Sequence, residues 1–142
     1  MIFKLITGNW ADLHETARGV RFDVFVIEQG VPVELEWDEW DPLCVHVVAQ
    51  DEAGHAIGTG RLLPDGHIGR MAVIKSARGA GVGGAILSIL LQEAIKRGDT
   101  LVCLNAQIHA EHFYARFGFT REGEEFSDAG IPHVYMRYGS LT

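Results

Sequence analysis

Residues 68–98, IGRMAVIKSARGAGVGGAILSILLQEAIKRG, contain the clearest structural pattern of the chain. The apolar run 68–74 predicts a strand, and the glycine cluster 79–84 predicts a tight turn. From Val82 onward apolar residues recur at helical spacing, and Gly98 follows a basic pair of the kind found at helix C-termini. The stretch therefore predicts a strand, a glycine turn and a helix in succession.

The glycine turn is the first candidate ligand site. Four glycines in six residues cost backbone entropy, which indicates that the turn needs the close approach of a ligand. The start of the following helix offers free N–H groups that favour a phosphate, and Lys75 and Arg78 add positive charge. A tight packing turn without a ligand is the alternative interpretation.

Two common phosphate motifs do not fit. Gly79, Gly81 and Gly84 satisfy the dinucleotide pattern G-x-G-x-x-G, but they lie in mid-chain, and the next predicted strand, Leu101–Asn105, lacks a terminal acidic residue. No Gly-Lys-Ser/Thr follows, which excludes a nucleotide-hydrolysing P-loop.

The same residues resemble a known family. Residues 78–83 resemble the R/Q-x-x-G-x-G/A pyrophosphate loop of GCN5-related N-acetyltransferases, and residues 112–119 resemble that family's F-Y-x-x-x-G-F segment. Residues 21–29 and 130–133 are similar to an ElaA-like bacterial subgroup. The resemblance implies an α/β fold with a mixed, centrally splayed sheet of six to seven strands and helices on both faces.

The resemblance also implies acetyl-CoA as the cofactor and transfer of an acetyl group to a primary amine by direct attack in a ternary complex. The backbone of Met71 and Val73 is expected to pair with the pantetheine arm. The residues expected to contact the cofactor are Met71, Ala72, Val73, Arg78, Gly79, Ala80, Gly81, Val82, Gly83, Gly84, Asn105, Phe113 and Tyr114.

Three residues are candidates for the chemistry. Tyr114 matches the family's thiolate-protonating tyrosine, with a packing aromatic as the alternative. His133 is the expected base, because neutral imidazole accepts a proton near pH 7 and its segment resembles one that carries a base histidine in glyphosate N-acetyltransferase and its relatives. A structural histidine is the alternative, with Glu28 as the substitute base.

The residues indicate the chemical nature of the acceptor amine less clearly than that of the cofactor. The candidate acceptor contacts are Arg21, Glu28, Arg70, Gln107 and His133. Arg21 and Arg70 favour an anionic acceptor, whereas an acidic segment favours a cationic one. A solvated acidic loop is the favoured interpretation of that segment. Its carboxylates are Glu28, Glu34, Glu36, Asp38, Glu39 and Asp41.

A small-metabolite amine is the favoured acceptor, because the chain has no added domain for a protein substrate. A protein amine remains open. A non-catalytic acyl-CoA sensor or partner-binding module is the alternative from a different functional class.

Composition sets the remaining limits. A chain of 142 residues that is 47% hydrophobic predicts a single domain, 1–142, with one core. The net charge of −7 disfavours nucleic acid. Without an apolar run of membrane length or a signal segment, we expect a cytoplasmic protein that does not bind a membrane. A homodimer is left open.

Cysteines and histidines suggest no metal site. Cys44 and Cys103 lie in apolar runs and are expected to be buried and reduced. His46, His109 and His112 have no familiar metal spacing, so solvated or capping roles are expected for them.

Alternation and turn residues predict the other elements. Asp12 and Glu15 predict the capped start of a helix that ends near Gly30, and 34–42 is expected to be a charged loop. A third helix is expected over roughly 109–117. Strands are expected at 2–6, 45–50, 56–63, 68–74, 101–105, 120–126 and 133–138.

Overall fold

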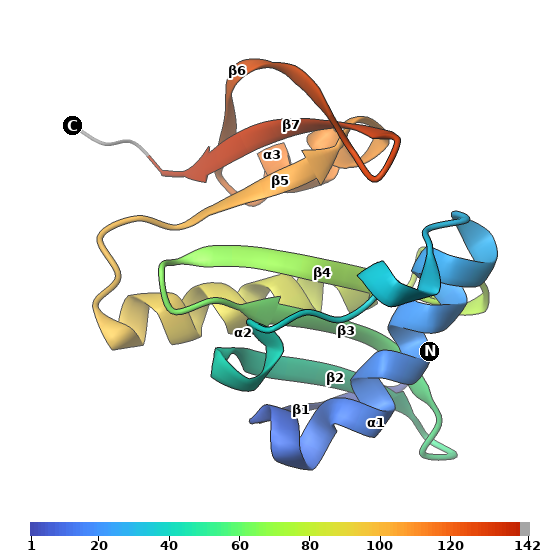
Figure 1. The fold of residues 1–142 in the computed structure, drawn as a ribbon. Helices are drawn as coiled ribbons and strands as arrows, with labels where there is room; N and C mark the ends of the chain where they lie inside the picture. Colours follow the sequence, from blue (N-terminus) through green and yellow to red (C-terminus); the bar gives the residue numbers. More distant parts are fainter. Residues whose placement is uncertain (140–142) are drawn as a thin grey trace.

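The computed structural model describes residues 1–139, so the last three residues of the predicted domain lie outside the described part. Its single sheet has seven strands in the order β1-β2-β3-β4-β5-β7-β6 (Figure 1). The strands are β1 Phe3–Gly8, β2 Val45–Asp51, β3 Ala56–Leu62, β4 His67–Val73, β5 Cys103–Gln107, β6 Phe119–Asp128 and β7 Ile131–Tyr138. The α-helices are α1 Trp10–Arg21, α2 Val82–Arg97 and α3 Glu111–Arg116.

Helices cover both faces of the sheet. Helix α1 lies on one face of β2, β3 and β4, and α2 lies on the opposite face (Figure 1). Every strand pair is antiparallel except β4 with β5. The predicted mixed sheet with two helical layers is therefore confirmed.

The sheet opens between β4 and β5. These strands pair only at His67 with Cys103 and at Ile68 with Leu104, and then diverge (Figure 1). Beyond this point the facing edges of both strands lack a neighbouring strand. The splay predicted from the family resemblance is confirmed, and it leaves backbone donors and acceptors of β4 for a ligand.

A β-bulge interrupts β4 beside the splay. Arg61 of β3 pairs with Gly69, but Thr59 pairs with Ala72, so two residues of β4 oppose one residue of β3. Arg70, in the bulge, has a φ of 49°, which is a strained conformation for a residue with a side chain. Such strain is concentrated at functional sites, and here it lies where the two strands separate.

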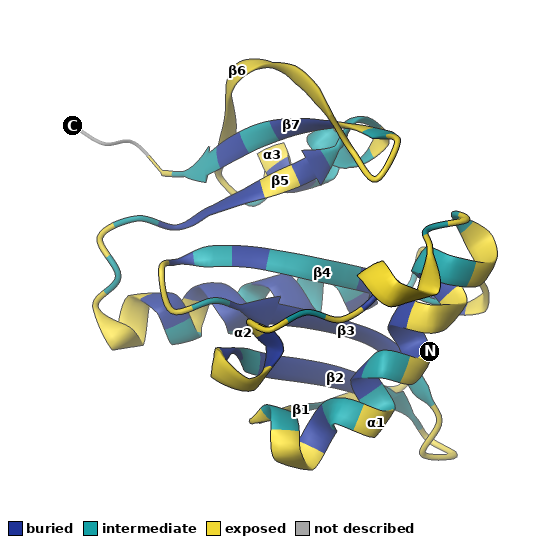
Figure 2. Cartoon of the chain, in the orientation of Figure 1, coloured by how far each residue is buried: buried dark blue, intermediate teal, exposed yellow. Residues whose placement is uncertain are grey.

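The main core lies between α2 and the sheet. Ile86, Leu87 and Leu90 of α2 are fully buried, whereas β6 is exposed along nearly its whole length (Figure 2). Gly60 of β3 permits the close approach of α2, because a Cβ atom there would lie 2.9 Å from side-chain carbons of both Ile86 and Leu90. The same packing holds β4 firmly in place beside the splay.

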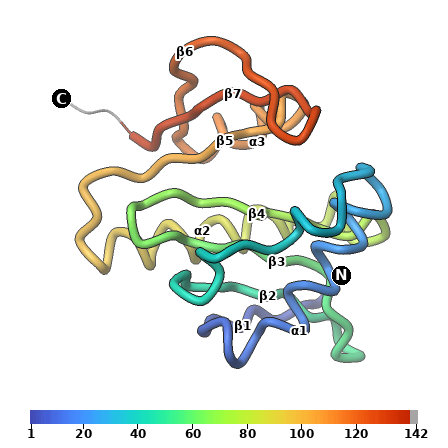
Figure 3. The backbone as a smooth tube through the Cα atoms, in the orientation of Figure 1, coloured from blue at the N-terminus to red at the C-terminus, as the bar shows by residue number. Residues whose placement is uncertain are grey.

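The first helix differs from the prediction at its start. Asn9 is the N-cap, and its side chain accepts a hydrogen bond from the backbone N–H of Asp12 at 3.0 Å, so Asp12 is not the cap. After Arg21 the chain continues without a break into a π-helix, Phe22–Glu28 (Figure 3). This wider turn was not predicted, although the helical segment ends near Gly30 as expected.

Burial confirms one sequence interpretation and corrects another. Cys44 and Cys103 are buried free thiols, as predicted. His46 is fully buried and its Nε2 lies 2.8 Å from the carbonyl oxygen of Asp41, so of the two roles expected for it, solvated or capping, the solvated one is wrong. No helix within residues 1–139 has the length and apolarity needed to span a bilayer.

Candidate active site

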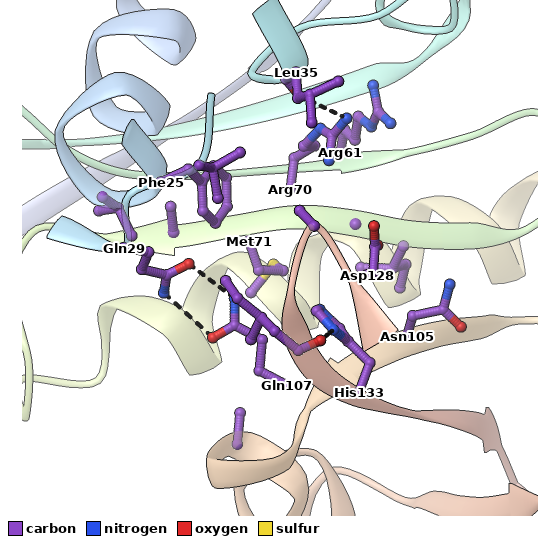
Figure 4. A pocket seen from close by; sticks show the side chains of 18 of the residues that line it. Phe25, Gln29, Leu35, Arg61, Arg70, Met71, Asn105, Gln107, Asp128 and His133 are labelled. Carbon is purple, nitrogen blue, oxygen red and sulfur yellow. Dashed lines mark hydrogen bonds between the residues drawn. The ribbon is translucent and has the colours of Figure 1, made fainter. Parts of the chain in front are cut away.

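A pocket of about 850 Å³ fills the space beside the splay. Its walls come from the π-helix, β4, β5 and the turn between β6 and β7 (Figure 4). The predicted site residues that line this larger pocket are Glu28, Arg70, Met71, Ala72, Val73, Arg78, Asn105, Gln107, Tyr114 and His133. One pocket thus gathers residues from both halves of the chain.

A second pocket, of about 490 Å³, lies beside the glycine turn. The predicted cofactor residues that line this glycine-turn pocket are Met71, Ala72, Val73, Arg78, Gly79, Gly81, Val82, Gly83, Gly84, Phe113 and Tyr114. Ala80 is absent from the lining and packs against the main core instead. Because β4 and Tyr114 line both pockets, the two spaces meet at these residues.

The glycines of the turn have two different roles. Gly79 and Gly81 have φ values of 82° and 84°, and a Cβ atom at either would have no heavy atom within 4 Å, so space remains for a ligand. A Cβ atom at Gly84 would lie 2.7 Å from Phe117, so Gly84 permits α2 to pack against α3. The open left-handed turn before the N-terminus of α2 fits a diphosphate group.

Tyr114 lies where the pockets meet. Its side chain is buried at 9% exposure, with aromatic contacts to Phe113 and Phe119. Burial raises the pKa of the phenol to about 12, which keeps it protonated at neutral pH. Tyr114 can therefore supply a proton to a group bound between the two pockets.

His133 lies across the larger pocket on β7. Its Nδ1 is 2.7 Å from the carbonyl oxygen of Ile131, so Nδ1 carries the proton in the neutral ring and donates it to this oxygen. The ring also stacks on Phe126 at 5.9 Å. This arrangement leaves Nε2 with the free lone pair that a base requires.

Glu28 and Arg78 form a bidentate ion pair at the edge of the larger pocket. Both carboxylate oxygens accept hydrogen bonds from the guanidinium at 2.6 Å. The hydrogen bond from Arg78 is the main cause that lowers the pKa of Glu28. Glu28 is therefore a weaker base here than an unpaired glutamate, which favours His133 as the base.

The predicted solvated loop at 34–42 instead contributes to a continuous arginine–carboxylate network. The network alternates four guanidinium groups with three carboxylates and consists of Arg18, Glu36, Arg21, Asp41, Arg61, Asp38 and Arg70. Glu36 and Asp41 are buried, so solvation is the wrong interpretation for both.

Arg21 does not contact the larger pocket. It is 1% exposed and donates hydrogen bonds to the side chains of Glu36 and Asp41 at 2.8 to 2.9 Å. All its terminal nitrogens are thereby engaged within the protein. The prediction that Arg21 binds the acceptor is therefore wrong, because this guanidinium holds the segment over α1 in place.

Arg70 ends the network at the pocket wall. Its Nη2 bonds weakly to the Leu35 carbonyl at 3.3 Å and to Asp38 at 3.2 Å, and its buried Nε has no partner within the described chain (Figure 4). Burial and the neighbouring charge of Arg61 lower the pKa of Arg70. Four positive and three negative groups leave one positive charge in excess, and Arg70 is the member best placed to offer it to a ligand.

Several pocket residues were missed from the sequence. Gln29 was missed, and it exchanges amide hydrogen bonds at 3.0 and 3.2 Å with the predicted Gln107 across the splay (Figure 4). Asp128 lines the larger pocket, and Arg116 lines the glycine-turn pocket with its guanidinium 5.9 Å from the ring of Phe113. No sequence pattern marks these residues, because their proximity arises from the packing of the π-helix, β5, α3 and the β6–β7 turn.

Within residues 1–139, no group of three or more His, Cys, Asp or Glu side chains is placed to hold a metal ion.

Comparisons with known proteins agree with this geometry. Residues 38–139 match the model of the acetyltransferase (GNAT) domain. The N-acetyltransferase YjcF of Bacillus subtilis strain 168 is 44% identical over 121 residues, covering 82% of this chain and 86% of the relative.

Solved structures with the same fold include an acyl-CoA N-acyltransferase from Pseudomonas aeruginosa, with 32% identity, a TM-score of 0.86 and coverage of 97% of this chain and 100% of the other. Escherichia coli ElaA has 25% identity, a TM-score of 0.85 and coverage of 96% and 99%. The fold, the domain match and these relatives together place the chain in the GNAT family of acetyltransferases, which makes it an acyltransferase that depends on acetyl-CoA.

Proposed function

We propose that this enzyme transfers the acetyl group of acetyl-CoA to the primary amine of a small metabolite, by direct attack while both substrates are bound. The observation that carries the proposal is the meeting of the two pockets at β4 and Tyr114. A cofactor in the glycine-turn pocket and an amine in the larger pocket would meet there. No covalent enzyme intermediate is needed in such an arrangement.

The chain offers a binding element for each part of the cofactor, which supplies an acetyl thioester when bound. The N–H groups at the glycine turn and the start of α2 hold the diphosphate. The unpaired edge of β4, with Met71 and Val73, receives the pantetheine arm as an added strand. Backbone N–H groups on the edge of β4 that has no partner beyond Ile68 are available to the thioester oxygen as it gains negative charge.

His133 and Tyr114 divide the proton transfers. His133 Nε2 accepts the proton that the ammonium group must lose before it attacks, because its Nδ1 is already engaged with Ile131. Tyr114 holds its proton at neutral pH and gives it to the sulfur that leaves. The two residues belong to β7 and α3, so each approaches the meeting point from its own element.

The charges of the larger pocket favour an acceptor that carries an anionic group beside its amine. Arg70 lines the pocket and makes only two long hydrogen bonds through Nη2, so it can offer the excess positive charge to a carboxylate or phosphate. Asp128 lines the same pocket and forms no ion pair within residues 1–139, so it attracts the ammonium group. The three carboxylates of the arginine–carboxylate network are paired with arginines and do not select a cation.

A screen of amines, scored by release of free thiol from acetyl-CoA, tests the activity and the acceptor class. Amino acids and amino sugar phosphates should react faster than matched amines without an anionic group. Arg70→Met should remove this preference by raising the KM for the anionic acceptors. Binding of acetyl-CoA without acetylation of any amine would support a sensor, and efficient turnover of peptides alone would move the activity to protein amines.

The proton roles have separate tests. Tyr114→Phe should lower kcat by on the order of 10²-fold with little change in cofactor affinity, while Tyr138→Phe, outside both pockets, serves as the control. His133→Ala should remove the acidic limb of kcat/KM, with exposed His112→Ala as its control. An unchanged acidic limb in His133→Ala would assign the base to Glu28 or water.

A further inference from the structure

The guanidinium of Arg78 faces away from its expected phosphate partner. Its Nη1 and Nη2 donate to Glu28, and its Nε donates to the carbonyl oxygen of Val73 at 2.9 Å. All three nitrogens are thus bound within the protein, although Gly79, the next residue, begins the phosphate-binding turn. In this arrangement Arg78 adds little to the attraction of a diphosphate.

The pair joins the two pockets. Arg78 lines both of them, whereas Glu28 lines only the larger pocket. Lys75 is the other cation that acts on Glu28, and its contribution to the lowered pKa of Glu28 is smaller than that of Arg78. The availability of the Glu28 carboxylate in the larger pocket therefore depends mainly on where the Arg78 guanidinium lies.

The pair is weak enough to exchange. The side chains of Arg78 and Glu28 are 41% and 37% exposed, and an ion pair with this much solvent contact contributes about 1 kcal/mol or less. A diphosphate on the turn carries more negative charge than one carboxylate, and its oxygens accept bidentate hydrogen bonds from arginine equally well. The arriving diphosphate is therefore an effective competitor for Arg78.

We propose that the diphosphate of the cofactor draws Arg78 away from Glu28, and that the released carboxylate then completes the binding site for the ammonium group of the acceptor. This inference rests on the proposed function, because it requires acetyl-CoA at the glycine turn. Glu28 becomes a positioning residue whose availability is controlled by the cofactor. The cofactor consequently binds before the acceptor.

Calorimetry with coenzyme A tests the competition directly. Glu28→Gln should bind coenzyme A roughly two- to five-fold more tightly than the wild type, because Arg78 no longer has to leave an ionised partner. Pantetheine, which lacks the diphosphate, should bind both proteins equally. Asp23→Asn is the matched control, since Asp23 is an exposed carboxylate on the same π-helix and lies outside both pockets.

A double variant checks that the effect passes through Arg78. Arg78→Met should weaken coenzyme A binding, and adding Glu28→Gln to it should produce no further change. A tightening by Glu28→Gln that persists in the Arg78→Met background would overturn the proposal. So would weaker or unchanged coenzyme A binding by Glu28→Gln alone.

The wild-type protein offers an independent readout by carbon-13 NMR. The pKa of the Glu28 carboxyl, lowered in the free protein, should rise when coenzyme A is saturating, because the hydrogen bond from Arg78 is lost. An unchanged pKa in the complex would mean that the pair stays closed. If coenzyme A does not bind the wild type at all, it is the proposed function that fails, so the two failures are distinguishable.

The acceptor half of the proposal has its own measurement. With the fastest amine from the thiol-release screen, Glu28→Gln should raise the KM for the amine more than it lowers kcat. An unchanged KM would show that the released carboxylate does not contact the acceptor.

Discussion

Asp41 is the carboxylate on which the arginine–carboxylate network depends most. It is fully buried and accepts hydrogen bonds from Arg21 at 2.8 and 2.9 Å and from Arg61 at 2.8 Å. The backbone N–H of Asp38 adds a further bond at 3.1 Å. Asp41→Asn keeps the shape of the side chain but leaves two buried guanidinium groups one negative charge short.

The structure gives the expected magnitude. Burial alone would raise the pKa of Asp41, but the hydrogen bond and charge of Arg21 outweigh it and lower the pKa from 3.8 to about 2. At about 1.4 kcal/mol per pH unit, this shift corresponds to roughly 2.5 kcal/mol of stability at neutral pH. Removing one partner from a buried ion pair costs about 3–5 kcal/mol, so Asp41→Asn should lose an amount in that range at pH 7.

The sign of the pH dependence follows from the direction of the shift. Because the folded-state pKa of Asp41 is depressed, its contribution is complete above the unfolded value of 3.8 and declines as pH falls toward 2. About 1 kcal/mol of it should be gone at pH 3. The stability difference between wild type and Asp41→Asn should therefore shrink between pH 5 and pH 3.

Urea unfolding followed by tryptophan fluorescence at pH 7, 5 and 3 measures these differences. Asp23→Asn, an exposed carboxylate outside the network, should stay within about 0.5 kcal/mol of the wild type. A loss below about 1 kcal/mol for Asp41→Asn at pH 7 would refute the reasoning. A difference that does not change with pH would also refute it, because Asp41 would then have an ordinary pKa.

Two further predictions concern backbone strain and a buried histidine. Gly66→Ala should lower Tm far more than Gly54→Ala. Both glycines have positive φ, but only at Gly66 would a Cβ atom collide with the Leu101 carbonyl oxygen. Equal losses of Tm in the two variants would contradict this prediction. Burial lowers the pKa of His46 below 6.5, so the stability present above pH 6.5 should decline as pH falls below it. His46→Gln should flatten the decline in Tm between pH 6.5 and 5, and an unchanged slope would assign the decline to other groups.

Local patterns were sufficient for the central part of the fold. The apolar spacing from Val82 to Arg97 and the Gly98 that follows predicted the bounds of α2 as they are found. The glycine turn and the residues from His112 to Phe119 were specific enough to indicate the family, and with it the splayed sheet. These signals are readable because capping, helical spacing and left-handed glycines are properties of neighbouring residues.

The charges of the site could not be read in the same way. The five acidic residues of segment 34–42 looked like part of a solvated loop, whereas Glu36 and Asp41 are buried against arginines on α1 and β3. The partners are separated by 15 to 20 residues along the chain, and no local pattern relates them. For this reason Arg21 was predicted to bind the acceptor, whereas in the folded protein its guanidinium is paired with Glu36 and Asp41.

Residues close together along the chain were sufficient to predict the order of the elements and the glycine turn before α2. Which cations remain available for a ligand depends on tertiary contacts: the terminal nitrogens of Arg21 are paired with Glu36 and Asp41, Arg70 makes only two long hydrogen bonds at the pocket wall, and Arg78 is held by Glu28. The physical reason is that the free energy of a charge depends on burial and on partners within a few ångströms, and the fold sets both.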